Sequence, residues 1–315
     1  MKVVINPGKD GNVIATVAIG GDYLKSWEQF ASKNWKKYCK RHSLGLIVFD
    51  SNLIDMSDSH WKKPNWQKLL IGSFLSKEGM DINNVCFLDS DILINPWSPN
   101  IFDNYDDTTI GMISQVHNLP YPSPISDINR RIAYLRNKYY SHKYPLDSAL
   151  FMTPQEVFEY HGLKPFQNYA CTGVFLFNVN IHSELMSNWF YSYGKGIETL
   201  TGGGEEPHLN FEVQSYGKIT WLDYKFQALW NYEMAWKYPF LYQNGKVKDE
   251  ITRKCIEASL FTNYFLHFAG SWYESDMWKN DLIFNSSVSK EFDGFYKYTK
   301  IPVTGKPAGM VKPDK

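Results

Sequence analysis

In the first third of the chain, short apolar runs alternate with segments in which apolar side chains recur every three or four residues. Residues 12–19, 44–50 and 85–96 are apolar runs rich in β-branched side chains, and each predicts a buried strand. Residues 23–43 and 65–79 carry apolar or aromatic side chains at helical spacing, and each predicts a helix. Strand, helix, strand, helix, strand at this spacing predicts an α/β protein with a Rossmann-like, mostly parallel sheet.

The second half of the chain continues this alternation less regularly. Residues 172–179 predict a further buried strand, and residues 182–194 and 205–217 predict helices. Residues 260–272 are apolar and aromatic and predict a strand that ends in His, Gly and Trp. We therefore expect one sheet flanked by helices along most of the chain.

No linker or repeat divides residues 1–290, which we expect to form a single domain. Residues 115–168 are rich in Pro, Tyr and Ser, with one predicted helix over residues 127–140, and they are expected to form an insertion over the active site. Residues 291–315 combine Lys, Gly and Pro and predict a loosely held basic tail.

Composition excludes several classes of protein. Lys plus Arg and Asp plus Glu number 33 each, so the formal net charge is zero, which argues against a nucleic-acid-binding protein. The apolar stretches are far shorter than the roughly 18–20 residues of a membrane span, and the N-terminal sequence lacks the apolar segment of a signal peptide. The four cysteines are widely spaced without a CxxC pair, which predicts free thiols in a reducing compartment and a cytoplasmic protein.

The strongest chemical signal is the pair Asp89 and Asp91, in the sequence FLDSDILI. Open α/β sheets bind ligands at the carboxyl ends of their strands, where this pair is expected. Two carboxylates in one turn offer the hard oxygen ligands that Mg²⁺ and Mn²⁺ prefer, and they leave room for a diphosphate. The alternative interpretation is a polar turn that ends a strand without binding a metal.

Two other segments carry candidate site residues. His267 follows an apolar run, and it is either a metal ligand at a strand end or a hydrogen-bonded core histidine. Glu205 and Glu206 follow three glycines at the start of a predicted helix, where the helix dipole stabilises acidic side chains even without a ligand. Because successive helical residues point about 100° apart, we expect only one glutamate to face the site and the other to meet its rim or a basic partner.

In this order, the segments resemble the retaining glycosyltransferases of GT-A fold, most closely family eight, the glycogenin and lipopolysaccharide galactosyltransferase group. The matching elements are Thr16 to Tyr23, Lys68-Leu69, Asp89-Ser90-Asp91, Cys171-Thr172-Gly173, Glu205 to Asn210, and Leu266 to Gly270. The series WQK…DSD…TGVFLFN also resembles the xylosyltransferase and galactosyltransferase family of this fold. The resemblance covers about residues 12–272 and implies a single GT-A-type domain.

The resemblance implies a metal-dependent glycosyltransferase, a hexosyltransferase of polysaccharide biosynthesis that uses a nucleotide-sugar donor. The donor would be a UDP-sugar and the acceptor a carbohydrate, glycolipid or glycoprotein, with retention of anomeric configuration and with peripheral membrane contact open. Mn²⁺ or Mg²⁺ would be held by Asp89, Asp91 and His267. Glu205 would contact the donor sugar, and Glu206 would lie nearest the face where a nucleophile would stand. The implied contacts to the nucleotide sugar are Ala18, Ile19, Tyr23, Lys68, Asp89, Ser90 and Gly270.

Some of these positions also have an ordinary interpretation, or depart from the family. Tyr23 would lie beside the uracil, or it is simply an aromatic residue of a first helical turn. Gly20 replaces the usual Asn, and Glu205-Glu206 replaces Asp-Gln. The family's Lys-Pro-Trp does not follow Gly270, so Lys68 or Lys279 would have to supply the phosphate-binding lysine.

A basic group in the insertion also has two interpretations. It is either a solvated face or a holder of an anionic acceptor. Its members are Arg130, Arg131, Arg136 and Lys138.

Two other functions compete with transfer. A catalytically silent protein of the same fold would bind a nucleotide sugar or glycan without turnover. A nucleotidyltransferase would need a Gly-rich loop bearing Arg or Lys after the first strand, which Gly20-Gly21-Asp22-Tyr23 does not provide.

Overall fold

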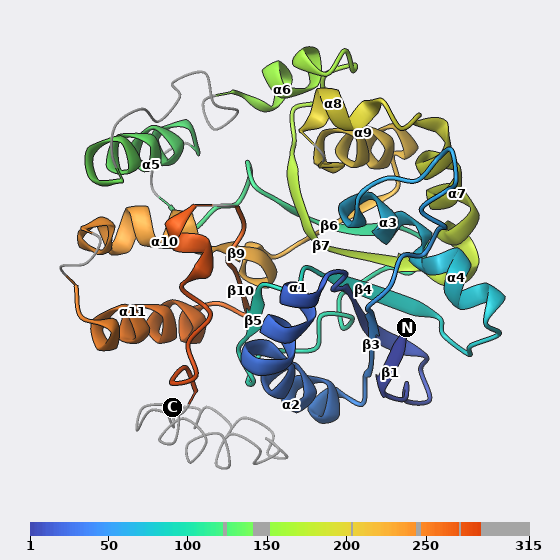
Figure 1. Cartoon of the computed structure of the whole chain (residues 1–315), viewed down its shortest axis with the longest axis horizontal. Helices are drawn as coiled ribbons and strands as arrows, with labels where there is room; N and C mark the ends of the chain where they lie inside the picture. Colours follow the sequence, from blue (N-terminus) through green and yellow to red (C-terminus); the bar gives the residue numbers. More distant parts are fainter. Residues whose placement is uncertain (122–124, 141–151, 203, 244–246, 271, 285–315) are drawn as a thin grey trace, which may run out of the picture.

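The computed structural model describes residues 1–121, 125–140, 152–202, 204–243, 247–270 and 272–284 (Figure 1). Within them, a seven-stranded sheet has the spatial order β1-β3-β2-β4-β7-β6-β8. Its strands in chain order are β1 (Lys2–Ile5), β2 (Asn12–Val17), β3 (Gly45–Phe49), β4 (Asn84–Leu88), β6 (Ile110–Ser114), β7 (Ala170–Asn178) and β8 (Ile219–Leu222).

Strand direction divides this sheet into two parts. β2 pairs in parallel with both β3 and β4, as the spacing of the first three predicted strands requires. β7 runs antiparallel to β4 and to β6, while β6 pairs in parallel with β8, and β1 is an antiparallel edge strand. The predicted α/β fold with helices flanking the sheet is confirmed, and the sheet is mixed because β7 enters between β4 and β6 against their direction.

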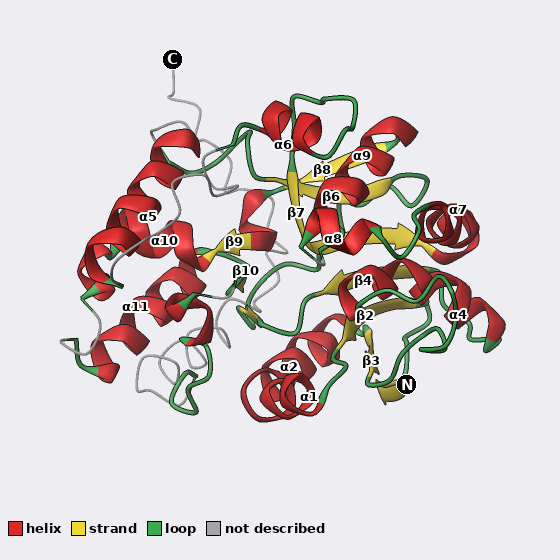
Figure 2. Cartoon of the chain, turned by 45° about the horizontal axis from the view of Figure 1, so that its top comes forward, coloured by secondary structure: helices red, strands yellow, loops and turns green. Residues whose placement is uncertain are grey.

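Helices cover both faces of the sheet (Figure 2). Successive side chains of β2 point to opposite faces, so Ile14 packs in one apolar cluster and Val13 and Ala15 in the other. Trp35 of the second helix packs with Ile14, and Leu75 packs on the opposite face. The helices of this part are α1 (Gly21–Ser26), α2 (Ser32–His42), α3 (Pro64–Gln67), α4 (Ile71–Lys77), α7 (Val179–Ser192), α8 (Ile197–Thr201) and α9 (Glu206–Tyr216), with a π-helical turn over Trp27–Ala31.

A second, three-stranded sheet has the order β5 (Ile92–Ile94), β10 (Phe265–His267), β9 (Ala228–Leu229). The predicted strand over 85–96 is therefore two strands, because the chain leaves the main sheet at Asp89. The predicted strand over 260–272 is wrong in its first part: helix α11 (Asp249–Thr262) continues to Thr262, and only β10 is extended. Apolar and aromatic residues fit a buried helix as well as a buried strand, and burial alone does not separate the two.

The segment expected to be an insertion connects neighbouring strands. Ser114 of β6 pairs with Ala170 of β7, so the chain leaves the sheet after β6 and returns beside it. Helices α5 (Ile125–Tyr139) and α6 (Pro154–Tyr160) lie in this connection, and α5 lies beside α10 (Trp230–Lys237) (Figure 1). Its position over an active site stays a prediction, and residues 141–151 and the tail 291–315 lie outside the described residues.

Two further expectations concern cysteines and membranes. All four cysteines are described, and none of them forms a disulfide. In the described part of the chain, the helices are too short or too polar to cross a bilayer.

Candidate metal and donor site

Asp89, Asp91 and His267 come together at the junction of the two sheets. Asp89 follows β4 directly, Asp91 precedes β5, and His267 ends β10, where it pairs with Ile92 of β5. His267 Nε2 lies 3.3 Å from Asp91 Oδ1 and 3.6 Å from Asp89 Oδ2. One ligand atom from each residue lies within 4.8 Å of the others, so a single cation can reach all three.

The three side chains differ in their access to solvent. His267 is buried, whereas the side chains of Asp89 and Asp91 keep 39% and 28% of their surfaces exposed. Burial raises the pKa of Asp89, and repulsion from Asp91 adds to this rise. Burial would also raise the pKa of Asp91, but the adjacent His267 outweighs it and lowers that pKa. Burial would lower the pKa of His267, but Asp91 outweighs it and raises that pKa well above its ordinary value. The carboxylates therefore favour a positive charge at this position, which a divalent cation would supply.

The donor set of this cluster fits a divalent cation. Two carboxylates supply hard oxygen ligands and the imidazole supplies a nitrogen. His267 Nε2 is buried and makes no hydrogen bond with good geometry, although two carboxylates face it. A buried polar nitrogen of this kind normally has a partner, and a cation between it and the carboxylates would be one.

Gly173 makes room for this cluster. It lies in β7, and its carbonyl accepts a hydrogen bond of 2.8 Å from the backbone N–H of Asp89. A Cβ at this position would overlap the His267 imidazole and would lie only 2.8 Å from Asp89 Oδ2. The absence of a side chain at Gly173 is therefore a condition for His267 and Asp89 to approach each other.

Gly173→Ala is expected to lower Mn²⁺ affinity and any metal-dependent activity at least roughly 10-fold, while lowering the free energy of unfolding by about 1–3 kcal/mol. The added methyl group must displace His267 or Asp89, since strand β7 is held on both sides. The measurements are Mn²⁺ titration and urea denaturation. Gly194→Ala is the matched control, since a Cβ at Gly194 meets nothing within 4 Å. Unchanged Mn²⁺ affinity in Gly173→Ala would contradict this role.

Lys68 and Glu205 form a buried ion pair below the site. Both side chains are almost fully buried, and Lys68 Nζ contacts Glu205 Oε1 and donates a 2.9 Å hydrogen bond to the carbonyl of Thr172. The Thr172 hydroxyl donates to the same Glu205 oxygen. Burial would lower the pKa of Lys68, but the carboxylates of Glu205 and Asp89 outweigh it and raise that pKa. The charge of Lys68 is thus neutralised inside the protein.

Glu206 is the glutamate with more access to solvent. It is half-buried at the start of α9, and its carboxylate accepts a hydrogen bond of 3.4 Å from the backbone N–H of Thr172. Burial raises the pKa of Glu206 to about 7, and repulsion from Glu205 adds to this rise. The sequence predicts that one glutamate meets a basic partner, and in the structure Glu205 is the glutamate paired with Lys68.

Some of the residues expected to contact the nucleotide follow the carboxyl ends of the parallel strands β2 and β4, namely Ala18, Ile19, Asp89 and Ser90. Ala18 is buried and donates its N–H to the carbonyl of Phe49 at 2.8 Å, which joins the ends of β2 and β3. Ile19 and Ser90 are half-buried, and Tyr23 keeps 67% of its surface exposed. Tyr23 is therefore not a core aromatic, and its ring is available to a ligand.

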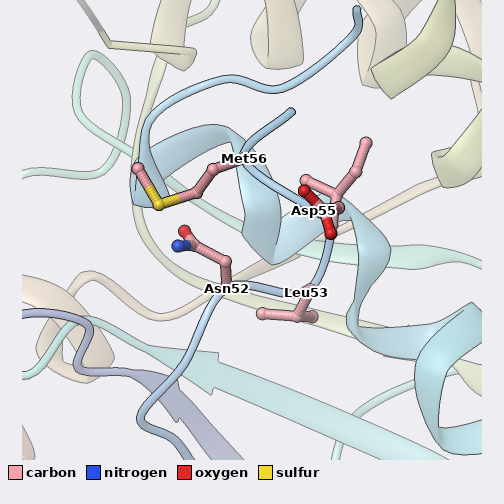
Figure 3. A pocket seen from close by; sticks show the side chains of 5 residues that line it. Asn52, Leu53, Asp55 and Met56 are labelled. Atoms are coloured by element: carbon pink, nitrogen blue, oxygen red, sulfur yellow. The ribbon is translucent and has the colours of Figure 1, made fainter. Parts of the chain in front are cut away.

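A pocket of about 530 Å³ follows the end of β3, lined by residues 52–56 (Figure 3). Gln67 supports it from below: its amide donates to Asn52 Oδ1 and accepts from the Leu53 N–H, both at 2.8 Å. Because β2, β3 and β4 are parallel, this loop and the Asp89 turn leave the sheet at the same edge.

Lys279 is the second candidate for a phosphate-binding lysine. Its side chain is 40% exposed and pairs with Asp276 at 2.6 Å, and its charge contributes to the lowered pKa of Asp91. Gly270, three residues after His267, has φ +105°, a conformation that favours glycine. Lys279 thus keeps a solvent-accessible side chain, whereas Lys68 is buried.

The basic group of α5 is partly used within the fold. Arg136 is buried and its Nε donates to Glu274 at 2.7 Å, and Arg131 Nε donates to the Ala235 carbonyl at 2.6 Å. These bonds attach α5 to α10 and to the turn around Glu274. Arg130 and Lys138 do not share these bonds, so two of the four basic residues are used within the fold, and the binding of an anionic acceptor by the group stays a prediction.

Three residues beside His267 were not singled out for a role in the sequence analysis. Besides Gly173, these are Cys171, whose Sγ lies 3.7 Å from His267 Nδ1, and Gln227, whose Nε2 lies 3.2 Å from the same atom. Gln227 precedes β9, a strand of two residues without a periodic signal, so its proximity to His267 depends on tertiary pairing alone.

No protein-family model matches this chain. Among curated proteins, none is significantly similar in sequence. Solved structures do align with it, including a glycosyltransferase involved in the glycosylation of the major capsid of PBCV-1, with TM-score 0.47 and 10% identity over 85% of this chain and 98% of that chain. The galactosyltransferase LgtC in complex with donor and acceptor sugar analogues gives TM-score 0.45 and 12% identity over 94% of this chain and 98% of that chain.

A third alignment is with WbbM, a bifunctional glycosyltransferase, with TM-score 0.43 and 14% identity over 92% of this chain and 52% of that chain. All three TM-scores lie below 0.5, and the function is therefore inferred from the site itself.

Proposed function

We propose that this chain is a metal-dependent glycosyltransferase. It transfers a sugar from a nucleotide-diphosphate sugar, with UDP as the first choice of nucleotide, to a carbohydrate-bearing acceptor, and it retains the anomeric configuration of the sugar. The observation that carries the proposal is the meeting of Asp89, Asp91 and His267 within reach of one cation, where the turn after β4 meets the end of β10. Residues from distant parts of the sequence converge there on one cation position, at the sheet edge where α/β proteins bind ligands.

The proposed role of each residue in the site follows from its contacts in the structure. Asp89, Asp91 and His267 would hold Mn²⁺ or Mg²⁺, which when bound supplies Lewis-acid stabilisation of the leaving diphosphate. Lys279 would add a positive charge on the phosphate side, because its side chain is accessible to solvent whereas that of Lys68 is buried. Tyr23 would lie against the base, and Lys68 would hold Glu205 in place.

Glu206 would face the donor sugar. An ionised carboxylate stabilises positive charge that develops on the sugar ring during transfer, and it does so most strongly in a site closed to water. Glu205 would contribute through its position beside Thr172, since its own charge is neutralised by Lys68.

The proposal is tested by incubating the full chain with a panel of UDP-, GDP-, ADP- and CMP-sugars, with Mn²⁺ or with EDTA, and measuring release of the sugar. Hydrolysis of at least one donor is expected with Mn²⁺ and not with EDTA. Binding of a nucleotide sugar without turnover, also in the presence of glycan acceptors, would favour the competing proposal of a catalytically silent binding protein. Equal turnover with and without the chelator would exclude metal dependence.

Glu206→Gln is expected to lower kcat roughly 10- to 100-fold and to leave the donor Kd within about 3-fold. Only the ionised carboxylate assists, so the wild-type kcat is expected to rise as the pH passes through about 7, the pKa of Glu206. The neutral amide does not titrate, and this limb of the profile should be missing in the variant. The measurement is kcat and donor Kd between pH 5.5 and 8.5.

Glu212→Gln is the control for this substitution, since Glu212 lies on the same helix and accepts from Tyr193 away from the site. An unchanged kcat and an unchanged pH profile in Glu206→Gln would show that the carboxylate has no catalytic part.

A further inference from the structure

His267 has a different neighbour at each ring nitrogen. Nε2 faces the carboxylates of Asp89 and Asp91, at 3.6 and 3.3 Å. Nδ1 faces Gln227, whose Nε2 lies 3.2 Å away, and Cys171, whose Sγ lies 3.7 Å away. The groups at both nitrogens therefore bear on which nitrogen of the neutral ring carries the proton, and a cation at Nε2 would leave the proton on Nδ1.

The position of Gln227 is fixed by the small sheet. Gln227 ends the 3₁₀ turn Tyr224–Gln227 and directly precedes β9, in which Leu229 pairs with His267 of β10. Its side chain is completely buried, and its Oε1 makes no hydrogen bond. A buried amide end without a partner is rare, and here Nε2 is the end that faces the imidazole while Oε1 has no partner. The choice of which amide end faces the ring therefore needs a chemical reason.

The chemistry of a metal-binding imidazole supplies that reason. A neutral ring that binds a cation through Nε2 carries its proton on Nδ1. The Nδ1–H group of such a ring almost always donates a hydrogen bond to an acceptor on the side away from the cation. The two ends of a carboxamide are similar in size, so a 180° turn of the Gln227 amide places Oε1 where Nε2 stands. Gln227 can then accept the Nδ1 proton, whereas a thiol such as Cys171 is a weak acceptor.

We propose that Gln227 is a positioning residue for the cation site: its amide oxygen accepts a hydrogen bond from the Nδ1–H group of His267 and keeps the Nε2 lone pair directed between Asp89 and Asp91. The inference rests on the proposed metal site and goes beyond its three ligands. Gln227 does not contact the cation, and its effect passes entirely through the imidazole.

The test measures Mn²⁺ binding to the full chain by the electron paramagnetic resonance signal of free Mn²⁺. Gln227→Met, which keeps the length and removes the acceptor, is expected to weaken Mn²⁺ binding roughly 10- to 100-fold. Gln227→Glu introduces a carboxylate that, when ionised, accepts hydrogen bonds and donates none. This variant is expected to bind Mn²⁺ at least as well as the wild type. Cys171→Ala is expected to change the affinity less than about 3-fold, because the thiol is a weak acceptor.

Asn95→Leu controls for damage to the small sheet. Asn95 is a buried amide directly after β5, and it bonds to the Asn263 carbonyl and the Trp97 N–H, with no contact to His267. This variant should lose stability and keep its Mn²⁺ affinity. If Gln227→Met loses affinity only in proportion to stability, as Asn95→Leu does, the positioning role is overturned.

The proton itself is observed in nitrogen-15 spectra of the Mg²⁺-loaded protein, since Mg²⁺ is diamagnetic. Protonated Nδ1 of His267 is expected, and protonated Nε2 overturns the inference. Asp91→Ala separates the two proposals. If Asp91→Ala loses Mn²⁺ binding while Gln227→Met retains it, only the role of Gln227 fails, and if the wild type does not bind Mn²⁺, the metal site and this inference fail together.

Discussion

Asp91→Ala is expected to lower sugar transfer at least about 100-fold and to remove metal-dependent binding of UDP. It deletes one of the three proposed metal ligands, and Lewis-acid stabilisation contributes several kcal/mol. The chain should still fold. The Asp91 side chain is 28% exposed, and the backbone bond from Phe268 N–H to the Asp91 carbonyl, 3.1 Å long, does not depend on the side chain. The free energy of unfolding should therefore change by less than about 1 kcal/mol.

The measurements are donor turnover, UDP binding with and without Mn²⁺, and urea denaturation. Asp91→Asn keeps the size of the side chain and is expected to behave like Asp91→Ala, since the charge is what the cation requires. Asp81→Ala removes an exposed aspartate elsewhere and should change nothing. Normal activity of Asp91→Ala in the presence of EDTA would contradict the metal site.

Lys68→Met is expected to cause the largest loss of stability, about 3–5 kcal/mol, because it leaves the buried Glu205 carboxylate without its counter-charge. Lys68 also lies over the Phe87 ring, with Nζ 4.9 Å from its centre, and donates to the Thr172 carbonyl. The ammonium thus has three partners that methionine cannot satisfy. Sugar transfer should be lost as well, since the displaced Glu205 lies next to Glu206.

The combination of Lys68→Met with Glu205→Gln separates charge from packing. It removes the unpaired charge and should recover most of the lost stability, as expected when a buried ion pair is replaced as a whole. Lys77→Met, at the exposed end of α4, is the control and should leave the urea midpoint unchanged. A urea midpoint of Lys68→Met equal to that of the wild type would show that the ion pair does not contribute to the stability of the protein.

The sequence predicts most of the first half of the fold, because periodicity is a local property. The run from Asn12 to Val17 predicts a strand buried on both faces, and its four central residues are fully buried. The helical repeat of Trp27 and Trp35 presents one apolar side to this strand. The same logic fails in residues 260–272. There Leu260 belongs to a helix and Phe265 to a strand, although both are fully buried and apolar.

For the candidate site, the sequence identifies the residue types that bind cations and the order in which they occur. Asp89 and Asp91 follow an apolar strand, and His267 follows another, so each is expected at a strand end. The ability to bind a cation can be predicted from the local sequence, since a carboxylate pair or an imidazole is a potential ligand wherever it lies.

Only the tertiary structure determines what lies around those ligands. Pairing of β10 with β5 and β9 brings Gln227 behind His267, and β7 brings Gly173 against both His267 and Asp89. The ion pair of Lys68 with Glu205 likewise joins two helical segments that are distant in sequence. The sequence alone therefore determines which side chains are chemically able to bind a cation or a sugar. Tertiary packing determines which of the two neighbouring glutamates is neutralised, because burial and counter-charge depend on contacts that no local sequence pattern encodes.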